Sequence, residues 1–166
     1  MMTKIVDVLL EVFEREANQA RVVLTAIEKT PKDYTPKAGM RTLWELANHL
    51  AQIPLLDPNM YSRKIANVEQ AQAKEKELRS NDLKGLLSIF DKGIKEVNKR
   101  FKNMTEEEFL AKNLKPFYET GPEKNWAYYM PEFITHISMH KMQLWMYLKL
   151  AGANVNMMTY YGITPK

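Results

Sequence analysis

Apolar residues recur along this chain at intervals of three and four positions, the spacing that places them on one face of an α-helix. The first such series runs through residues 3–29, and Thr30 and Pro31 end it. Its apolar positions are Ile5, Leu9, Phe13, Ala17, Ala20, Leu24 and Ile27. We predict a first long helix over this segment.

Two further series begin at residues that favour a helix N-terminus. Thr42 and Glu45 have the spacing of a capping box, which predicts the start of a second helix. Pro54 and Pro58 disturb its pattern, but we still expect helical turns over residues 59–78. A third helix is predicted over residues 82–102, with Asp82 as its N-cap.

The C-terminal part of the chain contains a short helix, an irregular stretch and a fourth long helix. Thr105 and Glu108 repeat the capping-box spacing, which predicts a short helix over residues 106–111. Residues 112–129 are irregular and rich in aromatic side chains, as functional loops often are. Pro131 fits the first position of a fourth helix that ends before Gly152. We expect no regular structure in residues 153–166.

Four long amphipathic helices predict an all-α fold, a four-helix bundle. The sequence shows no internal repeat and no linker, and its 166 residues suit one hydrophobic core. We therefore expect a single domain over residues 1–166.

Composition removes several classes of protein. The chain has no cysteine, which excludes a disulfide-stabilised scaffold and a cysteine nucleophile. Residues 1–16 are amphipathic with interspersed charges and no segment is apolar enough to span a membrane, so we expect a cytoplasmic protein without a membrane partner. The net charge of +4 is spread thinly, and we expect no nucleic-acid binding.

The candidate chemistry lies in the three histidines, His49, His136 and His140. His136 and His140 are four residues apart, which places their rings on one helix face, about 6 Å apart at Cβ. His140 continues the apolar series of the fourth helix, and His49 falls within that of the second. We therefore expect all three to point into the bundle, where isolated imidazoles are costly to bury.

Two interpretations satisfy such buried rings. Three neutral imidazoles can hold one zinc-like divalent ion and leave a fourth position open to water. Alternatively, each ring is a core histidine that is hydrogen-bonded to a carbonyl or carboxylate group. The joint inward phase of all three histidines favours the metal site.

Other side chains are candidates for tuning this site. Glu132 and Glu45 each lie one turn before a histidine, and each can orient a ring, act as fourth ligand or base, or simply cap its helix. Gln52 and Gln143 lie one turn after a histidine and can face the site. The methionines, including Met139, Met142 and Met146, are interpreted as core filler. The sequence singles out no catalytic residue.

Two segments together resemble the DinB/YfiT-like superfamily, named after damage-inducible DinB proteins. One is His136-Ile-Ser-Met-His140-Lys-Met-Gln143, followed by an apolar run that ends at Gly152; the other is Thr42-Leu-Trp-Glu-Leu-Ala-Asn-His49-Leu. The resemblance covers nearly the whole chain. It departs from the pattern at Lys141-Met142, where the family commonly has Arg-Gly, so helix packing and pocket shape are expected to differ beside the site.

The resemblance implies an up-down-down-up bundle, often a homodimer, with zinc or nickel on His49, His136 and His140. It further implies a small-molecule substrate, such as a low-molecular-weight thiol of the bacillithiol type. Two functions remain open: a metal-dependent S-transferase or hydrolase, and a non-catalytic stress-response protein whose ion is structural.

Overall fold

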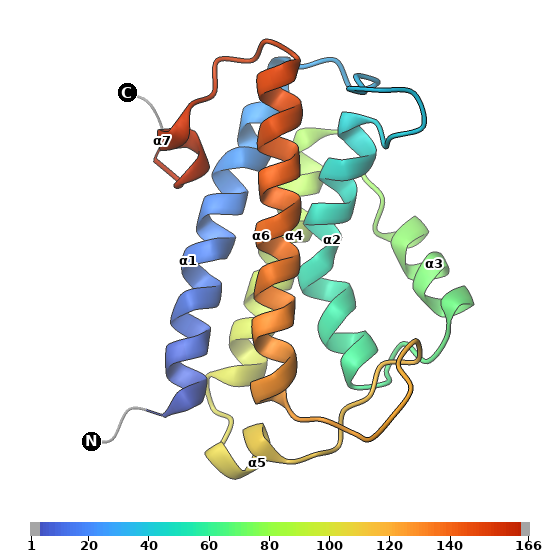
Figure 1. Ribbon diagram of the computed structural model, residues 1–166, viewed down its shortest axis with the longest axis vertical. Helices are drawn as coiled ribbons and strands as arrows, with labels where there is room; N and C mark the ends of the chain where they lie inside the picture. The colour runs from blue at the N-terminus through green and yellow to red at the C-terminus, as the bar shows by residue number, and fades with distance from the viewer. Residues whose placement is uncertain (1–3, 164–166) are drawn as a thin grey trace.

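Four long helices form the body of the protein in the computed structural model, which describes residues 4–163. They are α1 (Ile5–Thr25), α2 (Leu43–Tyr61), α4 (Leu83–Phe101) and α6 (Trp126–Leu150). α1 and α6 run in one direction while α2 and α4 run in the other, which gives the expected up-down-down-up bundle (Figure 1). Each helix packs against two neighbours, so that α2 lies between α4 and α6.

Three shorter α-helices and one 3-10 turn complete the described part of the chain. The turn η1 (Ala26–Lys29) extends α1, and α3 (Val68–Glu77) lies beside α2 (Figure 1). The helix α5 (Glu106–Leu110) closes one end, and α7 (Met157–Tyr160) packs on α1. Within residues 4–163 the sole β-type pairing is an isolated bridge between Leu114 and Lys124.

The predicted helix starts are confirmed at Thr42, Asp82 and Thr105. Thr42 and Thr105 each form a full capping box with the glutamate three residues on. The Asp82 carboxylate accepts a hydrogen bond from the Gly85 amide. Gly152 follows the last residue of α6 with φ +79°, and its amide donates to the Lys149 carbonyl, so a glycine suits this left-handed turn.

Other predicted boundaries were wrong. α2 continues through Pro54 and Pro58 to Tyr61 instead of weakening there. α6 begins five residues before Pro131, because the Asn125 side chain caps the Tyr128 amide and Trp126 is buried in the core. The tail contains the short helix α7, which Asn156 caps, although the sequence shows no periodicity there.

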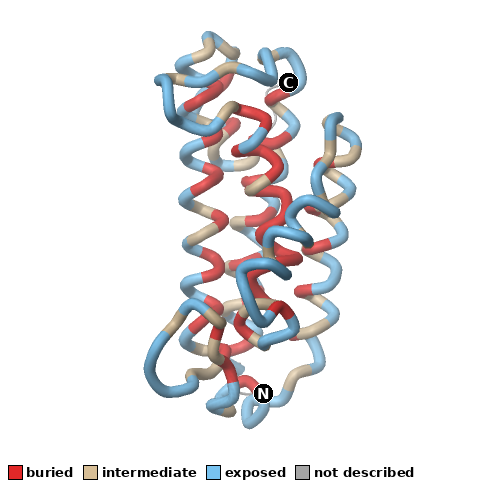
Figure 2. Tube along the Cα trace, turned by 90° about the vertical axis from the view of Figure 1, so that its right-hand side faces the viewer, coloured by how far each residue is buried: buried red, intermediate tan, exposed pale blue. Residues whose placement is uncertain are grey.

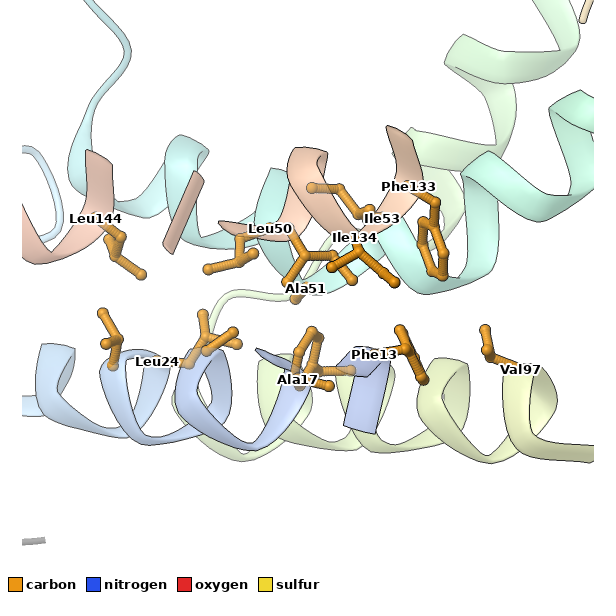
Figure 3. Close-up of a cluster of buried hydrophobic side chains, with 14 of the residues drawn as sticks. Phe13, Ala17, Leu24, Leu50, Ala51, Ile53, Val97, Phe133, Ile134 and Leu144 are labelled. Atoms are coloured by element: carbon orange, nitrogen blue, oxygen red, sulfur yellow. The ribbon is translucent and has the colours of Figure 1, made fainter. Parts of the chain in front are cut away.

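The hydrophobic core lies along the axis of the bundle, where the buried faces of the long helices meet (Figure 2). Phe13 of α1 stacks on Phe133 of α6 with ring centroids 5.3 Å apart. Leu50, Ala51 and Ile53 of α2 face Ala17 and Leu24 of α1 across this core (Figure 3). The two helices that carry the histidines, α2 and α6, are therefore fixed by packing on both sides of their shared edge.

Candidate metal centre

The three histidines come together where α2 and α6 pack against each other. One ring nitrogen from each of His49, His136 and His140 lies within 4.8 Å of the other two. Nε2 of His49 lies 3.1 Å from Nε2 of His140. Two nitrogens bound to one tetrahedral zinc at about 2.0–2.1 Å would be roughly 3.4 Å apart. The His49–His140 pair is thus near the separation that a shared ion requires, and the ring nitrogen of His136 lies within 4.8 Å of both.

Hydrogen bonds outside the cluster decide which nitrogen two of the rings present. Nδ1 of His136 lies 2.7 Å from Oδ2 of Asp57, and Nδ1 of His140 lies 2.7 Å from Oε1 of Gln143. Both oxygens accept hydrogen bonds, so each Nδ1 carries the proton. In the neutral rings, Nε2 of His136 and of His140 therefore holds a free lone pair, which is the form that binds a metal.

The environment favours the neutral form of His49 and of His140. Burial, followed by the nearby His140, Arg41 and His136, lowers the pKa of His49 to about 3. Burial likewise lowers the pKa of His140, although its hydrogen bond to Gln143 opposes this effect. Protons therefore compete weakly with a metal ion at these two rings near neutral pH.

The histidines are less deeply buried than their phase in the sequence predicted. His140 is buried, but His49 is only partly buried and the His136 side chain is 28% exposed. The α2–α6 contact lies at the edge of the bundle, so a ring placed there reaches solvent on one side. A ligand from solution can therefore reach the cluster.

The sequence did not identify Asp57 as the partner of His136. Its carboxylate is buried, and burial raises its pKa while the hydrogen bond from His136 opposes that shift. The available signal was an acidic residue two turns after His49 within a largely apolar run. Because we expected Pro54 and Pro58 to disturb the second helix, we did not place Asp57 on the same helix as His49.

Glu45 and Glu132 do not hold the histidines. The Glu45 carboxylate accepts hydrogen bonds from Thr42 in the capping box, and no hydrogen bond joins Glu132 to His136. Burial and the nearby carboxylates of Glu119 and Asp57 raise the pKa of Glu132. Of the two candidate glutamines, Gln143 contacts His140 directly, whereas Gln52 lies in a cavity wall near His49 and donates to the Glu75 carbonyl.

Two cavities flank the cluster. One of about 520 Å³ lies between α2 and α3 and includes His49 in its wall. The other, of about 400 Å³, is lined by His136, Asp57, Glu132 and Tyr118, the last from the aromatic loop. A larger depression of about 720 Å³ between α1 and α4 contains none of the histidines. Space for a small molecule therefore exists on both sides of the candidate metal site.

The residues that depart from the family pattern lie away from this site. Lys141 is fully buried and faces α1, where its ammonium group pairs with Glu16 and lies 4.1 Å from the ring centroid of Tyr160. Met142 is exposed, as are Met139 and Met146, so these three methionines are not core filler. The larger side chain at position 142 consequently fills no space beside the histidines.

No helix among the described residues 4–163 is long and apolar enough to cross a membrane. No protein of curated function matches the sequence. The structure is similar to a crystal structure from Exiguobacterium sibiricum that is assigned to the DinB family, with a TM-score of 0.73 and 18% identity, over 94% of this chain and 97% of that one. The sequence itself matches the DinB family over residues 1–165. This chain therefore belongs to the DinB family.

Proposed function

We propose that this protein binds one divalent metal ion, zinc or nickel, through Nε2 of His136 and His140 and a ring nitrogen of His49. The observation that carries the proposal is the pair of Nδ1 hydrogen bonds to Asp57 and Gln143. Histidines that served only the core would need no such common orientation toward one point. When bound, the ion would act as a Lewis acid toward a water molecule or a substrate thiol.

We further propose that the site is catalytic and acts on a small molecule, as an S-transferase for a low-molecular-weight thiol or as a hydrolase. The partial exposure of His49 and His136 and the two adjoining cavities support a reaction over a purely structural ion. In this function Asp57 and Gln143 keep the rings oriented, and the cavity walls position the substrate. A cytoplasmic location is part of the proposal and rests on the sequence alone.

Metal content tests the first proposal. Purified wild-type protein is compared by elemental analysis with His140→Ala and with Thr135→Ala, an exposed position on the same helix. We expect close to one zinc or nickel per chain in the wild type and in Thr135→Ala, and almost none in His140→Ala. An absence of metal in the wild type after loading would leave the histidines as core residues.

Substrate assays test the second proposal on the metal-loaded protein. Conjugation of small thiols to a chromogenic electrophile and hydrolysis of activated esters are followed in parallel, with His140→Ala as the control. Turnover that depends on His140 supports an enzyme. The assay in which this turnover is seen, conjugation or hydrolysis, distinguishes a transferase from a hydrolase. A protein that holds its metal firmly and catalyses neither reaction supports the alternative, a non-catalytic stress-response protein with a structural ion.

We also propose a homodimer that forms through the outer face of α6, which no described element covers (Figure 1). Exposed apolar side chains follow one stripe of this helix: Tyr128, Met139, Met142, Met146 and Leu150. If two copies pack antiparallel about an axis between Met139 and Met142, Glu132 lies opposite the partner's Lys149. This charge complementarity supports a second copy of the chain as the occupant of the stripe.

A further inference from the structure

The helix α3 lies against the bundle without contributing to its core. None of its residues is buried, and it packs mainly against α2. Because α3 is polar and none of its residues is buried, burial of apolar surface contributes little to holding it beside α2. Some other interaction must hold this segment beside α2.

Polar side chains of α2 fix the C-terminal end of α3 and the turn after it. The Asn48 side chain makes two hydrogen bonds with the Ser80 backbone. Nδ2 of Asn48 donates to the Ser80 carbonyl at 3.0 Å, and the Ser80 backbone N–H donates to Oδ1 of Asn48 at 2.8 Å. Gln52 donates to the Glu75 carbonyl at 3.0 Å, and the Trp44 indole donates to the Ser80 carbonyl at 2.8 Å. Asn48 and Gln52 are only 5% and 4% exposed. The α2–α3 cavity therefore has a floor of fixed, buried polar groups.

Positively charged side chains surround this floor. Arg41, Lys76 and Arg79 line the cavity, and within residues 4–163 none of the three forms an ion pair. Two carboxylates also line it, but that of Glu45 is occupied by Thr42. The lining has one more positive than negative charge, and a divalent ion on His49 would raise this excess to three.

We propose that the α2–α3 cavity binds the anionic part of the substrate, a carboxylate or phosphate group held by Arg41, Arg79 and Lys76. This inference rests on the proposed metal function, because His49 lines the cavity and links it to the metal site. The cavity volume of about 520 Å³ is in the range of small-molecule sites. Arginine guanidinium groups suit such ligands because they donate paired hydrogen bonds to carboxylates and phosphates.

Binding of succinate and of inorganic phosphate tests the proposal without requiring turnover. The chain has three tryptophans, so its indole N–H signals form a small set in a nitrogen-15 NMR spectrum. The Trp44 indole reports on the α2–α3 contact, whereas Trp126 and Trp145 lie elsewhere and are internal controls. We expect the Trp44 signal to shift saturably as either anion is added, and the affinity measured from this shift to fall as salt is added.

Charge-removing variants locate the binding site. Arg41→Ala and Arg79→Ala are each expected to weaken binding of the preferred anion about tenfold, the loss of roughly one charge-assisted hydrogen bond. Arg15→Ala removes the same charge from an exposed position on α1 and is the matched control, with affinity expected within about twofold of the wild type. Tighter binding of succinate identifies a carboxylate ligand, and tighter binding of phosphate identifies a phosphoryl ligand.

The metal-free variant His140→Ala separates this proposal from the metal site. We expect it to bind the anion more weakly than the metal-loaded wild type and to keep the same dependence on Arg41. If the wild type acquires no metal, we expect both proteins to bind the anion equally and with that same dependence. Equal affinities in Arg41→Ala, Arg79→Ala and Arg15→Ala would overturn the proposal. An unmoved Trp44 signal at tens of millimolar succinate and phosphate would also overturn it.

Discussion

Asp57 determines how one histidine is presented to the candidate metal. Its buried carboxylate lies 2.7 Å from Nδ1 of His136 and 3.5 Å from the Tyr61 hydroxyl group. The carboxylate accepts a hydrogen bond from the Nδ1–H group, which keeps the ring in one tautomer and one orientation. Glu132 lines the same cavity, but it is Asp57 that accepts the hydrogen bond from His136.

Replacement of Asp57 by asparagine is expected to weaken metal affinity by about 10–100-fold. The amide keeps the size of the side chain, but its neutral oxygen accepts a weaker hydrogen bond from Nδ1–H of His136 than the carboxylate does. Affinity is measured by competition with a chelator, after circular dichroism has shown that the variant is folded. Glu132→Gln is the matched control and is expected to stay within about threefold of the wild type; equal losses in both variants would contradict a specific role for Asp57.

His49 gives the metal-free protein a defined pH dependence. Its pKa is lowered to about 3 in the folded chain, against an ordinary value near 6.5. Between these pH values the unfolded chain binds a proton that the folded chain does not, so the free energy of unfolding falls as the pH falls. The slope contributed by one such group is at most about 1.4 kcal/mol per pH unit.

Urea unfolding in the presence of a chelator, at several pH values from about 4 to 7, measures this slope. We expect His49→Gln to lose less stability than the wild type as the pH falls, because glutamine binds no proton in this range. Parallel curves for the two proteins would show that His49 protonates equally in both states. Metal binding itself is expected to weaken at low pH, since the ligands must be unprotonated.

At the scale of the helices, α2 and α4 approach each other closely at Gly93. A Cβ added to Gly93 would lie 2.6 Å from Cβ of Pro54 and 3.2 Å from its carbonyl carbon. Pro54 lies inside α2, between the turn that carries His49 and the turn that carries Asp57. The contact therefore helps to fix the helix on which two residues of the site lie.

Gly93→Ala is expected to destabilise the protein by about 1–3 kcal/mol, since overpacking exceeds the gain in helix propensity of about 1 kcal/mol. The free energy of unfolding in urea is the measurement. Lys92→Ala, at the exposed neighbouring position of α4, is the control and is expected to change stability by less than about 0.5 kcal/mol. A Gly93→Ala variant with a higher free energy of unfolding than the wild type would show that α2 and α4 can move apart to fit the methyl group without a cost in stability.

The prolines of α2 also show why helix boundaries were difficult to predict. Proline removes one backbone donor, which usually ends or bends a helix. The helix nevertheless continues through both prolines, and its last turn is stabilised from outside. The carbonyl of Pro58 in this turn receives hydrogen bonds from the Ser62 hydroxyl group at 2.8 Å and from Arg100 of α4 at 2.8 Å. The guanidinium group that helps to satisfy this carbonyl lies 42 positions further along the chain, where a local pattern cannot reveal it.

At the scale of the whole molecule, the outer face of α6 predicts self-association. Wild-type protein is expected to be a dimer by size-exclusion chromatography with light scattering, and Met139→Glu/Met142→Glu to be a monomer. Val8→Glu, at an exposed apolar position on α1, is the control and is expected to remain dimeric. A monomeric wild type at micromolar concentration would contradict the proposed homodimer.

Charge reversal tests the antiparallel arrangement itself. Glu132→Lys or Lys149→Glu alone would place like charges opposite each other and weaken the dimer, whereas the double reversal restores the attraction. We therefore expect both single variants to dissociate more readily than the wild type and the double variant to recover. An additive loss in the double variant would exclude this pairing.

The sequence by itself determined the all-α class, the four long helices and the identity of the three histidines. Apolar spacing and capping residues are local properties, and they specify which segments become helical and which face each helix buries. The phase of the histidines on two such faces was sufficient to predict that they would meet, and one ring nitrogen of each does lie within 4.8 Å of the other two.

Only the tertiary structure decided what surrounds those histidines. Asp57 reaches His136 across 79 positions of sequence, and Asn48 holds Ser80 across 32. Lys141 and Met142 are adjacent in the chain, yet one is buried against α1 and the other is exposed. Such contacts depend on how the helices are rotated and displaced against one another, and that arrangement follows from the packing of the entire core rather than from any single segment.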